Sequence, residues 1–388
     1  MKICKDSRLC CGCSACAAVC AHAAIKLLEN ERGFYRPVVD KLKCVECGLC
    51  AAVCPANEGD AANLKQKPLN ILAYANTDDE RRRSSSGAAF WALAQYAFQK
   101  GGVVYGACFD KDFRVAHKRC EDEAAAQACR VSKYSQSFVG AAFAEVLGDL
   151  RQGKLVLFSG APCQVAGLRS VLAKKGFDGT LVTCDFVCHG TPSNRLFREY
   201  IAFLEDKSGK KVVRYIHRPK DRGWGKFNAN TEKAIMSDGS ALYGTVESDV
   251  WRSIFYSNDA LNSCCYRCLY TDVGRVADFT LADFIGVDRF RKDLNDDKGL
   301  SVVMVNSEIA GRLVAEGVFE PGSAEIALAE VIPGNPMLQR PSIPNDDPDK
   351  FWRVHERKGF EGVARFVGAY GFVKRVKTIA KCLIGRVD

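Results

Sequence analysis

The first 55 residues hold two copies of a cysteine spacing that few folds can accommodate. Each copy reads C-x2-C-x2-C-x3-C, and Pro55 follows the second copy. This spacing is typical of bacterial ferredoxin domains with two 4Fe-4S clusters, in which three thiolates of one loop reach one cube and the fourth reaches its neighbour. The sequence therefore predicts one cluster on Cys10, Cys13, Cys16 and Cys54, and a second on Cys44, Cys47, Cys50 and Cys20.

A zinc-binding or disulfide-rich knob is the alternative for this region. Zinc sites, however, use CxxC pairs separated by longer arms. The chain has twenty cysteines, no apolar signal peptide and no run of roughly 18 apolar residues. We therefore expect a cytoplasmic protein whose cysteines hold metal in a reducing compartment. The net charge of +9 favours an anionic substrate, an acidic electron carrier or anionic lipid. We expect no nucleic-acid partner, because no basic stripe is interleaved with aromatic residues.

The chain divides into regions of different composition. The fold class that we predict is mixed, α+β and α/β, with a small ferredoxin-like domain before a larger α/β region in which strands alternate with helices. Residues 211–250 alternate more and indicate additional antiparallel strands. The predicted parts are a ferredoxin-type domain (1–60), a polar linker (61–69), an α/β flavin-binding region (70–260), a second cluster-bearing region (261–345) and a basic helical tail (346–388).

Four more cysteines suggest a third cluster. Cys163 and Cys188 each stand where a predicted strand ends and a helix begins, which is the edge where open α/β sheets bind ligands. Cys265 and Cys268 form a CxxC further along. Four converging thiolates would hold one 4Fe-4S cluster, with Cys264 as a substitute ligand. Small buried thiols and a redox-active Cys265–Cys268 dithiol are the alternatives. The other cysteines are interpreted as non-ligands, Cys11 with the least support.

Iron–sulfur clusters carry single electrons, whereas an organic substrate is usually reduced by two. Flavin is the usual cofactor that exchanges single electrons for electron pairs. The best local signal for its site is a serine loop that opens a helix, Ser84, Ser85, Ser86 and Gly87. An N-cap with a serine-rich loop is the alternative. Lys133, Tyr134 and Gln136 form a second polar group that suits a flavin ring or an anionic substrate, or a solvated loop. The catalytic residue is unknown, with Lys133, His189 and Asp283 as candidates.

Together these motifs resemble the coenzyme F-420 hydrogenase/dehydrogenase beta-subunit family over residues 10–345. Besides the cysteine repeat, the likeness is carried by Ser84–Gly87, Ser132–Ser137, Phe158–Leu168, Asp185–Ser193, Cys265–Cys268, Arg275–Phe284 and Asp296–Ser307. The resemblance implies FAD in the α/β region, contacted by Ser85, Ser86, Gly87, Lys133 and Tyr134. It also implies a further 4Fe-4S cluster on Cys163, Cys188, Cys265 and Cys268. The chain departs from the family's pattern at Ala88, Ala161, Leu269 and Ile285, beside the expected pockets.

The function that we predict is an iron–sulfur flavoprotein oxidoreductase. It would take electrons from a reduced carrier such as ferredoxin or flavodoxin and pass them to FAD and an anionic small-molecule or glycan substrate, as in surface polysaccharide biosynthesis. The alternatives are a non-catalytic electron-transfer subunit of a larger complex and an oxidoreductase that uses the deazaflavin coenzyme. A basic, apolar stretch at residues 373–385 also suggests peripheral contact with the inner face of a membrane.

Overall fold

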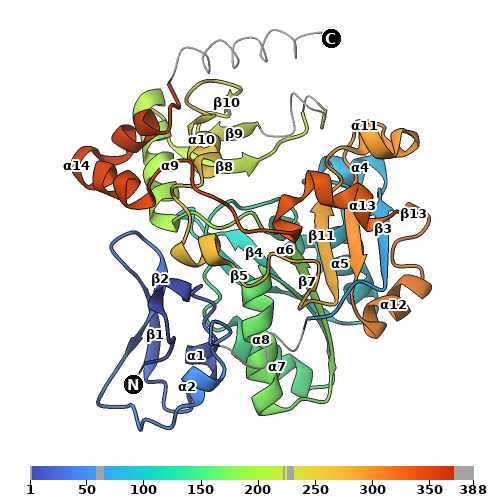
Figure 1. Ribbon diagram of the computed structural model, residues 1–388. Helices are drawn as coiled ribbons and strands as arrows, with labels where there is room; N and C mark the ends of the chain where they lie inside the picture. The colour runs from blue at the N-terminus through green and yellow to red at the C-terminus, as the bar shows by residue number, and fades with distance from the viewer. Residues whose placement is uncertain (1, 58–64, 222, 225–230, 371–388) are drawn as a thin grey trace.

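A mixed sheet of eight strands forms the centre of the molecule (Figure 1). The structure is a computed structural model that describes residues 2–57, 65–221, 223–224 and 231–370. The strand order is β13-β3-β12-β11-β7-β6-β4-β5. The four strands β4, β6, β7 and β11 are parallel, and the outer strands are antiparallel to their neighbours. In chain order the eight strands are β3 (Asn70–Tyr74), β4 (Val103–Phe109), β5 (Val115–Cys120), β6 (Leu155–Ser159), β7 (Thr180–Phe186), β11 (Phe279–Asp283), β12 (Ser301–Val305) and β13 (Ser323–Glu325). The predicted mixed fold with a parallel-containing sheet is confirmed.

Helices cover both faces of this sheet because its strands are apolar on both sides. Val103 on β4 belongs to the core beneath α7 (Ala142–Arg151) and α8 (Pro162–Lys175). Its neighbour Val104 belongs to the core beneath α5 (Ala89–Gln99) and α12 (Glu308–Ala315). Successive side chains of a strand point to opposite faces, so one strand contributes to two cores.

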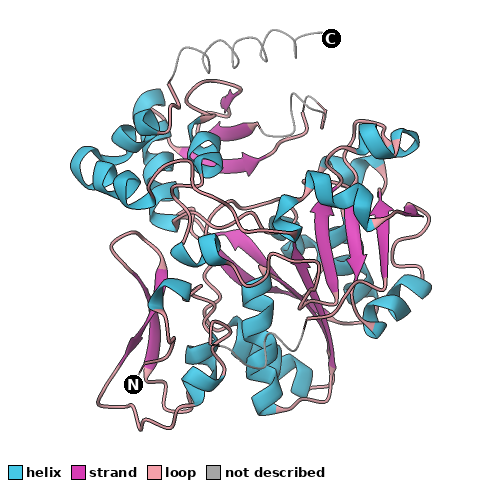
Figure 2. Cartoon of the chain, in the orientation of Figure 1, coloured by secondary structure: helices cyan, strands magenta, loops and turns pink. Residues whose placement is uncertain are grey.

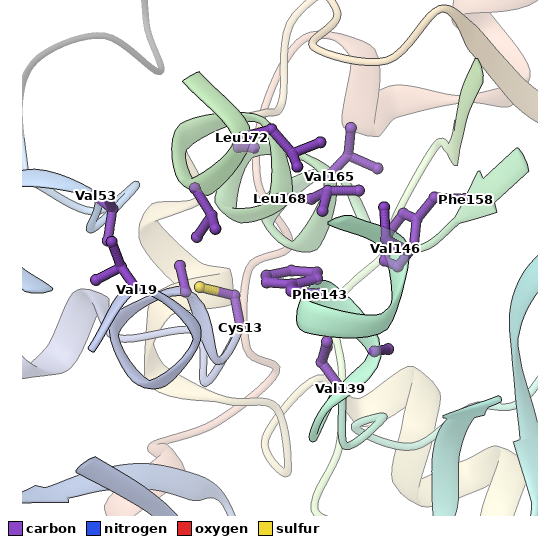
Figure 3. Packing of buried hydrophobic residues seen from close by; sticks show 14 of the residues in the cluster. Cys13, Val19, Val53, Val139, Phe143, Val146, Phe158, Val165, Leu168 and Leu172 are labelled. Carbon is purple, nitrogen blue, oxygen red and sulfur yellow. The ribbon is translucent and has the colours of Figure 1, made fainter. Parts of the chain in front are cut away.

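The N-terminal region packs against α7 and α8. It contains α1 (Ala15–Val19), the hairpin of β1 (Ile25–Glu29) and β2 (Tyr35–Val39), and α2 (Leu49–Ala52). Val19 and Val53 share a core with Phe143 and Leu168 (Figure 3). A side chain on Gly167 of α8 would place its Cβ only 2.9 Å from Cys13 Sγ. The approach of the cysteine loop to α8 therefore requires glycine at this position.

A third unit packs at the carboxyl end of β4. Its antiparallel sheet, ordered β10-β9-β8, is covered by three helices (Figure 2). Phe109, the last residue of β4, stacks on Phe197 of this unit with ring centroids 5.4 Å apart. The elements of the unit are β8 (Val212–His217), β9 (Glu232–Met236), β10 (Ala241–Tyr243), α9 (Asn194–Ser208), α10 (Val250–Ser257) and α14 (Pro348–Phe366).

The sheet crosses the boundary that we predicted at residue 260. β11 and β12 come from the region 261–345, yet they lie between β7 and β3 of the region 70–260. The reason is the antiparallel pairing of β12 with both β11 and β3, which the sequence does not reveal. The remaining helices are short: α4 (Asp78–Arg82), α6 (Glu123–Ala126), α11 (Val287–Phe290) and α13 (Leu328–Val331). Among the described residues, no helix has the length and apolar character that crossing a membrane requires. The predicted membrane-contacting stretch, residues 373–385, lies outside the described part.

Candidate metal-cluster and cofactor site

A cavity in the N-terminal region is lined by four of the predicted ligands, Cys10, Cys13, Cys16 and Cys54. The backbone turns tightly around it, with left-handed conformations at Gly12 (φ 69°) and Ser14 (φ 70°). Burial raises the pKa of the Cys10 thiol to about 11 and that of Cys16 to about 12. These cysteines are therefore neutral thiols in the protein alone, and bound metal would be needed to hold them as thiolates.

The second predicted set lies further from the sheet. Cys50 is within electrostatic range of Cys44 and Cys47, and Cys20 packs against the core that contains Cys50. Cys47 is the only exposed cysteine among those that the structure describes. In the described ranges, no three His, Cys, Asp or Glu side chains are close enough to hold a single metal ion. Thiols spread around a cavity suit a cube of several irons better than one zinc ion.

The four remaining predicted ligands meet at the edge of the sheet. Cys163 lies in the first turn of α8, Cys188 follows β7, and Cys265 and Cys268 lie in and directly after a short turn of 3-10 helix. Cys188 is within electrostatic range of Cys265 and Cys268, and Cys163 of Cys268. The backbone N–H of Thr191 donates to Cys265 Sγ at 3.4 Å. Burial raises the pKa of Cys268 to about 11.

Two further thiols join these groups. Cys264 interacts with the neighbouring Cys265 thiol. Cys11 interacts with the thiols of Cys13 on one side and of Cys163 on the other, and these thiols lower its pKa. Cys11 therefore lies between the first group of thiols and the one at the sheet edge, a position that its sequence neighbours gave no reason to expect.

Gln136 holds the two regions together instead of facing the serine loop. Its Nε2 donates to the carbonyl oxygen of Cys11 at 2.9 Å, and its Oε1 accepts from the Tyr35 N–H at 2.9 Å. The side chain is buried. Both ends of its amide are used at the junction between the cysteine loop and the larger region. The structure thus gives Gln136 a place apart from the other predicted cofactor residues.

The serine loop is bonded to its own protein through each hydroxyl group. Ser84 Oγ accepts from Arg130 Nη2 at 3.0 Å, Ser85 Oγ accepts from the Ser132 N–H at 2.8 Å, and Ser86 Oγ donates to the Leu300 carbonyl at 2.9 Å. A Cβ on Gly87 would lie 2.0 Å from the Tyr74 carbonyl oxygen, so only glycine fits there. The hydroxyls therefore shape the loop.

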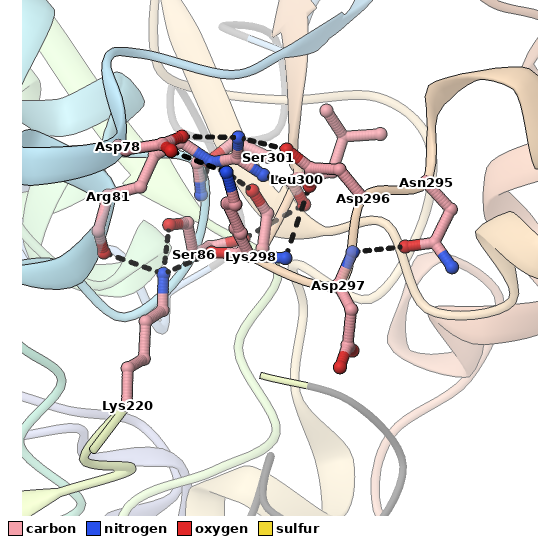
Figure 4. A network of polar contacts seen from close by, with 12 residues as sticks. Asp78, Arg81, Ser86, Lys220, Asn295, Asp296, Asp297, Lys298, Leu300 and Ser301 are labelled. Carbon is pink, nitrogen blue, oxygen red and sulfur yellow. Dashed lines mark hydrogen bonds and ion pairs between the residues drawn. The ribbon is translucent and has the colours of Figure 1, made fainter. Parts of the chain in front are cut away.

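Lys220 and Arg81 fasten this loop to residues 296–301 (Figure 4). Lys220 Nζ donates to the carbonyl oxygens of Arg81, at 2.7 Å, and of Ser86 and Lys298. The buried Arg81 guanidinium forms two hydrogen bonds with Asp296. Burial, followed by the charges of Arg218 and Arg81, lowers the pKa of Lys220 to about 7.

A polar centre beside the loop contains the candidate catalytic residue Asp283 and Tyr134, and the candidate Lys133 directly precedes Tyr134 in the chain. Asp283, the last residue of β11, accepts from Arg218 Nη1 at 2.6 Å. Tyr134 lies against this pair and against the His217 ring, 5.0 Å between centroids. Lys133 Nζ donates to the Ala128 carbonyl at 2.6 Å, and removal from water lowers its pKa to about 8. A group with this pKa can give up or take a proton near neutral pH.

His189, the third candidate, lies on the cluster side of the same centre. Its Nε2 donates to Asn258 Oδ1 at 2.6 Å, and its ring is 4.9 Å from that of Phe255. Phe255 in turn contacts Tyr134, 4.6 Å between centroids. Burial lowers the pKa of His189, so its ring is neutral at pH 7.

All these groups lie at one edge of the sheet. Register pairs Asp283 with Ser301, and Ser301 with Tyr74 of β3. The ends of β7 and β6 lead to Cys188 and Cys163 at the same edge, because β6, β7 and β11 are parallel. This is the edge where open α/β sheets bind ligands. The arrangement brings thiols for a metal cluster next to a cationic, polar centre.

Sequence reasoning missed several residues of this centre. The sequence indicates no role for Arg218 or Lys220. It also gives no sign of the buried pair of His217 Nδ1 with Glu232 Oε2, 2.7 Å apart. A usable signal was the run HRPK within the stretch predicted to form antiparallel strands, since basic residues at a strand end suit an anionic ligand.

Comparisons with known proteins agree with this geometry. Residues 9–57 match the model of the 4Fe-4S dicluster domain, which makes the chain an iron–sulfur protein. Residues 153–326 match the model that describes the C-terminal part of the coenzyme F420 hydrogenase/dehydrogenase beta subunit. These two matches relate the chain to the coenzyme F420 hydrogenase/dehydrogenase beta-subunit family, and the resemblance seen in the sequence is confirmed. The protein is thus an iron–sulfur redox protein related to the beta subunits of these enzymes, and electron transfer is consistent with that relationship.

Solved structures also contain a similar chain. It comes from the F420-reducing [NiFe] hydrogenase complex of Methanosarcina barkeri, studied as a xenon derivative, and has 17% identity and a TM-score of 0.48. The match covers 76% of this chain and 94% of that one. No curated protein matches this chain.

Proposed function

We propose that this chain is an iron–sulfur flavoprotein oxidoreductase that passes electrons from a small reduced carrier to FAD and an anionic organic substrate. The observation that supports it most is the succession of thiol groups from exposed Cys47 to Cys13, Cys11 and Cys163 at the sheet edge. When bound, the clusters would carry single electrons and the flavin would exchange them for electron pairs.

The proposed ligands are the twelve predicted cysteines. The cavity lined by Cys10, Cys13, Cys16 and Cys54 supports the first set, and the meeting of Cys163, Cys188, Cys265 and Cys268 supports the third. The second set, Cys44, Cys47, Cys50 and Cys20, follows from the repeated spacing. Cys264 and Cys11 lie beside the third set without belonging to it in this proposal.

For FAD, we propose contacts from Lys133, Tyr134 and the backbone of residues 85–87. The cations Arg130, Arg218 and Lys220 around the loop suit the negative charge of a dinucleotide. Because the serine hydroxyls are bonded within the protein, their part is to fix the loop. Lys133 is a suitable proton donor, since its pKa of about 8 lies close to neutral pH. The identity of the substrate, including a role in surface polysaccharide assembly, stays a prediction.

An electron carrier would dock around Cys47. The exposed apolar side chains Leu42 (99% exposed), Val45 (58%) and Leu49 (42%) surround this thiol on one loop and helix start. Lys41 and Lys43 are exposed on the same loop, together with Asp40, which pairs with Lys43 at 3.8 Å, and Glu46. The apolar contacts are therefore the main feature that would receive a small carrier such as ferredoxin or flavodoxin, with Lys41 beside them.

Anaerobic purification followed by iron and flavin analysis tests the proposal. We expect roughly twelve irons per chain and extractable FAD. Cys163→Ala should lower the iron content by roughly four, because it removes one ligand of the third set only. Cys184→Ala, a buried thiol of β7 outside the sets, is the matched control and should keep all iron. Full iron without flavin would contradict the flavoprotein assignment.

A non-catalytic electron-transfer subunit is the second candidate, because the matching family model describes a subunit of larger enzymes. Cofactor-loaded chain that co-purifies with a partner and turns over no substrate alone would favour this candidate over the first.

A further inference from the structure

Three thiols outside the proposed cluster ligands lie in a row on the far side of Lys133. Cys108 is on β4, Cys120 ends β5, and Cys129 ends the turn that follows α6. Cys129 Sγ is 3.9 Å from Cys120 Sγ, and it also interacts with the Cys108 thiol. Cys129 is therefore the middle thiol of the three and has a potential partner on each side.

The missing side chain of Gly106 makes this row possible. Val104 and Gly106 stand two residues apart on the same face of β4, and Cys120 pairs with Val104. A Cβ on Gly106 would lie 2.9 Å from Cys129 Sγ. The Cys129 thiol therefore occupies the space above Gly106, between Cys120 and Cys108. Any larger residue at 106 would push Cys129 away from both.

The surroundings favour thiol chemistry at Cys129. Cys108 and Cys120 are buried, while Cys129 is partly exposed, so a small reagent can reach the middle thiol first. The Lys133 ammonium group is within electrostatic range of all three sulfurs. The Cys108 thiol and this charge act to lower the pKa of Cys129, but Cys120 and burial outweigh them and raise it to about 11. Access and the middle position, rather than a low pKa, therefore single out Cys129 as the attacking thiol.

The segment after Cys129 is bonded to the serine loop. Arg130 pairs with Glu80, donates to Ser84 Oγ and lies over the Trp91 ring at 4.2 Å. The Ser132 N–H donates to Ser85 Oγ. A displacement of Cys129 would thus be carried to the loop proposed to hold FAD.

We infer that Cys120 and Cys129 are a thiol–disulfide site that reacts with low-molecular-weight disulfides. The Cys129 thiolate attacks the disulfide RSSR, forming a mixed disulfide and releasing RS⁻. The Cys120 thiolate then attacks the Cys129 sulfur, forming the Cys120–Cys129 bond and releasing a second RS⁻. In total two protein thiols are oxidised, one RSSR is reduced to two RSH, and the atoms balance. Bond formation requires the two sulfurs to close from 3.9 Å to about 2.05 Å.

Peptide mass mapping tests this directly, and its readout does not depend on the proposed flavin or clusters. The anaerobically purified full chain is incubated with glutathione disulfide and then denatured in the presence of N-ethylmaleimide, which alkylates the free thiols. It is then digested with trypsin. Cys120 and Cys129 share the tryptic peptide 120–130, whereas Cys108 lies in peptide 101–111. We expect peptide 120–130 to be two hydrogens lighter and unalkylated, and dithiothreitol to restore alkylation at both sites.

Variants and controls separate the other outcomes. Cys129→Ser should leave Cys120 alkylated, Cys108→Ser should leave the internal bond intact, and Cys184 should stay alkylated throughout. Full alkylation of peptide 120–130, or a glutathione adduct that stays on Cys129, would overturn the inference. A cross-link between peptides 101–111 and 120–130 in place of the internal bond would also overturn it. Iron content, measured in parallel, reports on the proposed function separately.

Discussion

The thiols at the two ends of this molecule are brought together in different ways. In the N-terminal region each predicted set takes three cysteines from one short loop and the start of its helix, α1 or α2. The fourth cysteine of each set follows the helix of the other set. At the sheet edge, the chain passes through α8, β7, α9 and the whole three-stranded sheet between Cys163 and Cys268. The first arrangement is set by local spacing, and the second exists only when the sheet has formed.

The difference also appears in what stabilises each end. Around the cysteine loops, tight turns and small residues are sufficient, and the cavity opens beside the hairpin. At the sheet edge, the loop after Cys268 is fixed by a buried guanidinium. Arg275 Nη1 donates to the Tyr270 carbonyl at 2.8 Å, and Nη2 pairs with Asp185 Oδ2 at 3.2 Å. The third set is therefore positioned by polar contacts between residues distant in the chain, whereas local spacing positions the first two sets.

Replacing this arginine should produce the largest effect. Arg275→Met leaves the fully buried Asp185 without its cation, and burial already raises the pKa of that carboxyl. We expect a loss of about 3–5 kcal/mol in the free energy of unfolding. Iron should fall by roughly four atoms, as for Cys163→Ala, since the loop of Cys268 loses its anchor. Anaerobic thermal unfolding and iron analysis measure both.

The matched control is Arg8→Met, because Arg8 forms an exposed pair with Asp6 at 3.0 Å. Solvent screens an exposed pair of this kind, so stability and iron content should hardly change. An Arg275→Met protein as stable as wild type, with full iron, would show that the third set does not depend on this network.

The junction between the two ends should give the next effect. Gln136→Leu leaves the Cys11 carbonyl and the Tyr35 N–H without their partner in a buried place. We expect a loss of about 2–6 kcal/mol in the free energy of unfolding, from about 1–3 kcal/mol for each of the two unpaired groups. Iron should stay in place, because no thiol is lost. Thermal unfolding measures the loss, and magnetic coupling between reduced clusters, seen by electron paramagnetic resonance, should weaken if the loop moves from α8.

Gln95→Leu on α5 is the control, since Gln95 has only a 3.5 Å contact with Glu123. Equal stability of the two variants would mean that the junction is held by apolar packing alone.

The sequence predicted the ends of this molecule better than its middle. The cysteine spacing indicated the N-terminal sets because spacing is local, and strand-to-helix transitions indicated the place of Cys163 and Cys188. Gln136 was assigned to the flavin because it follows Lys133 and Tyr134, but its side chain turns toward Cys11. Arg218 and Lys220 were missed because their partners are distant in the chain. Arg218 pairs with Asp283, and Lys220 donates to the carbonyl oxygens of Arg81 and Ser86. The eight-stranded sheet continues across residue 260 for the same reason, since β12 pairs with a strand distant in the chain.

The smallest effect on stability, and one confined to the exposed end, is expected for Leu42→Glu. Leu42 is 99% exposed beside the Cys44–Cys50 loop, so the free energy of unfolding should change by no more than about 0.5 kcal/mol. The new negative charge should slow reduction of the protein by ferredoxin about 2–10-fold, because it repels an acidic carrier. Reduction by dithionite should keep its rate. Val213→Glu places the same charge on another exposed apolar residue, on β8, 59% exposed and away from Cys47. If both variants slowed ferredoxin equally, the effect would come from net charge alone, and Cys47 would lose its assignment as the point of electron entry.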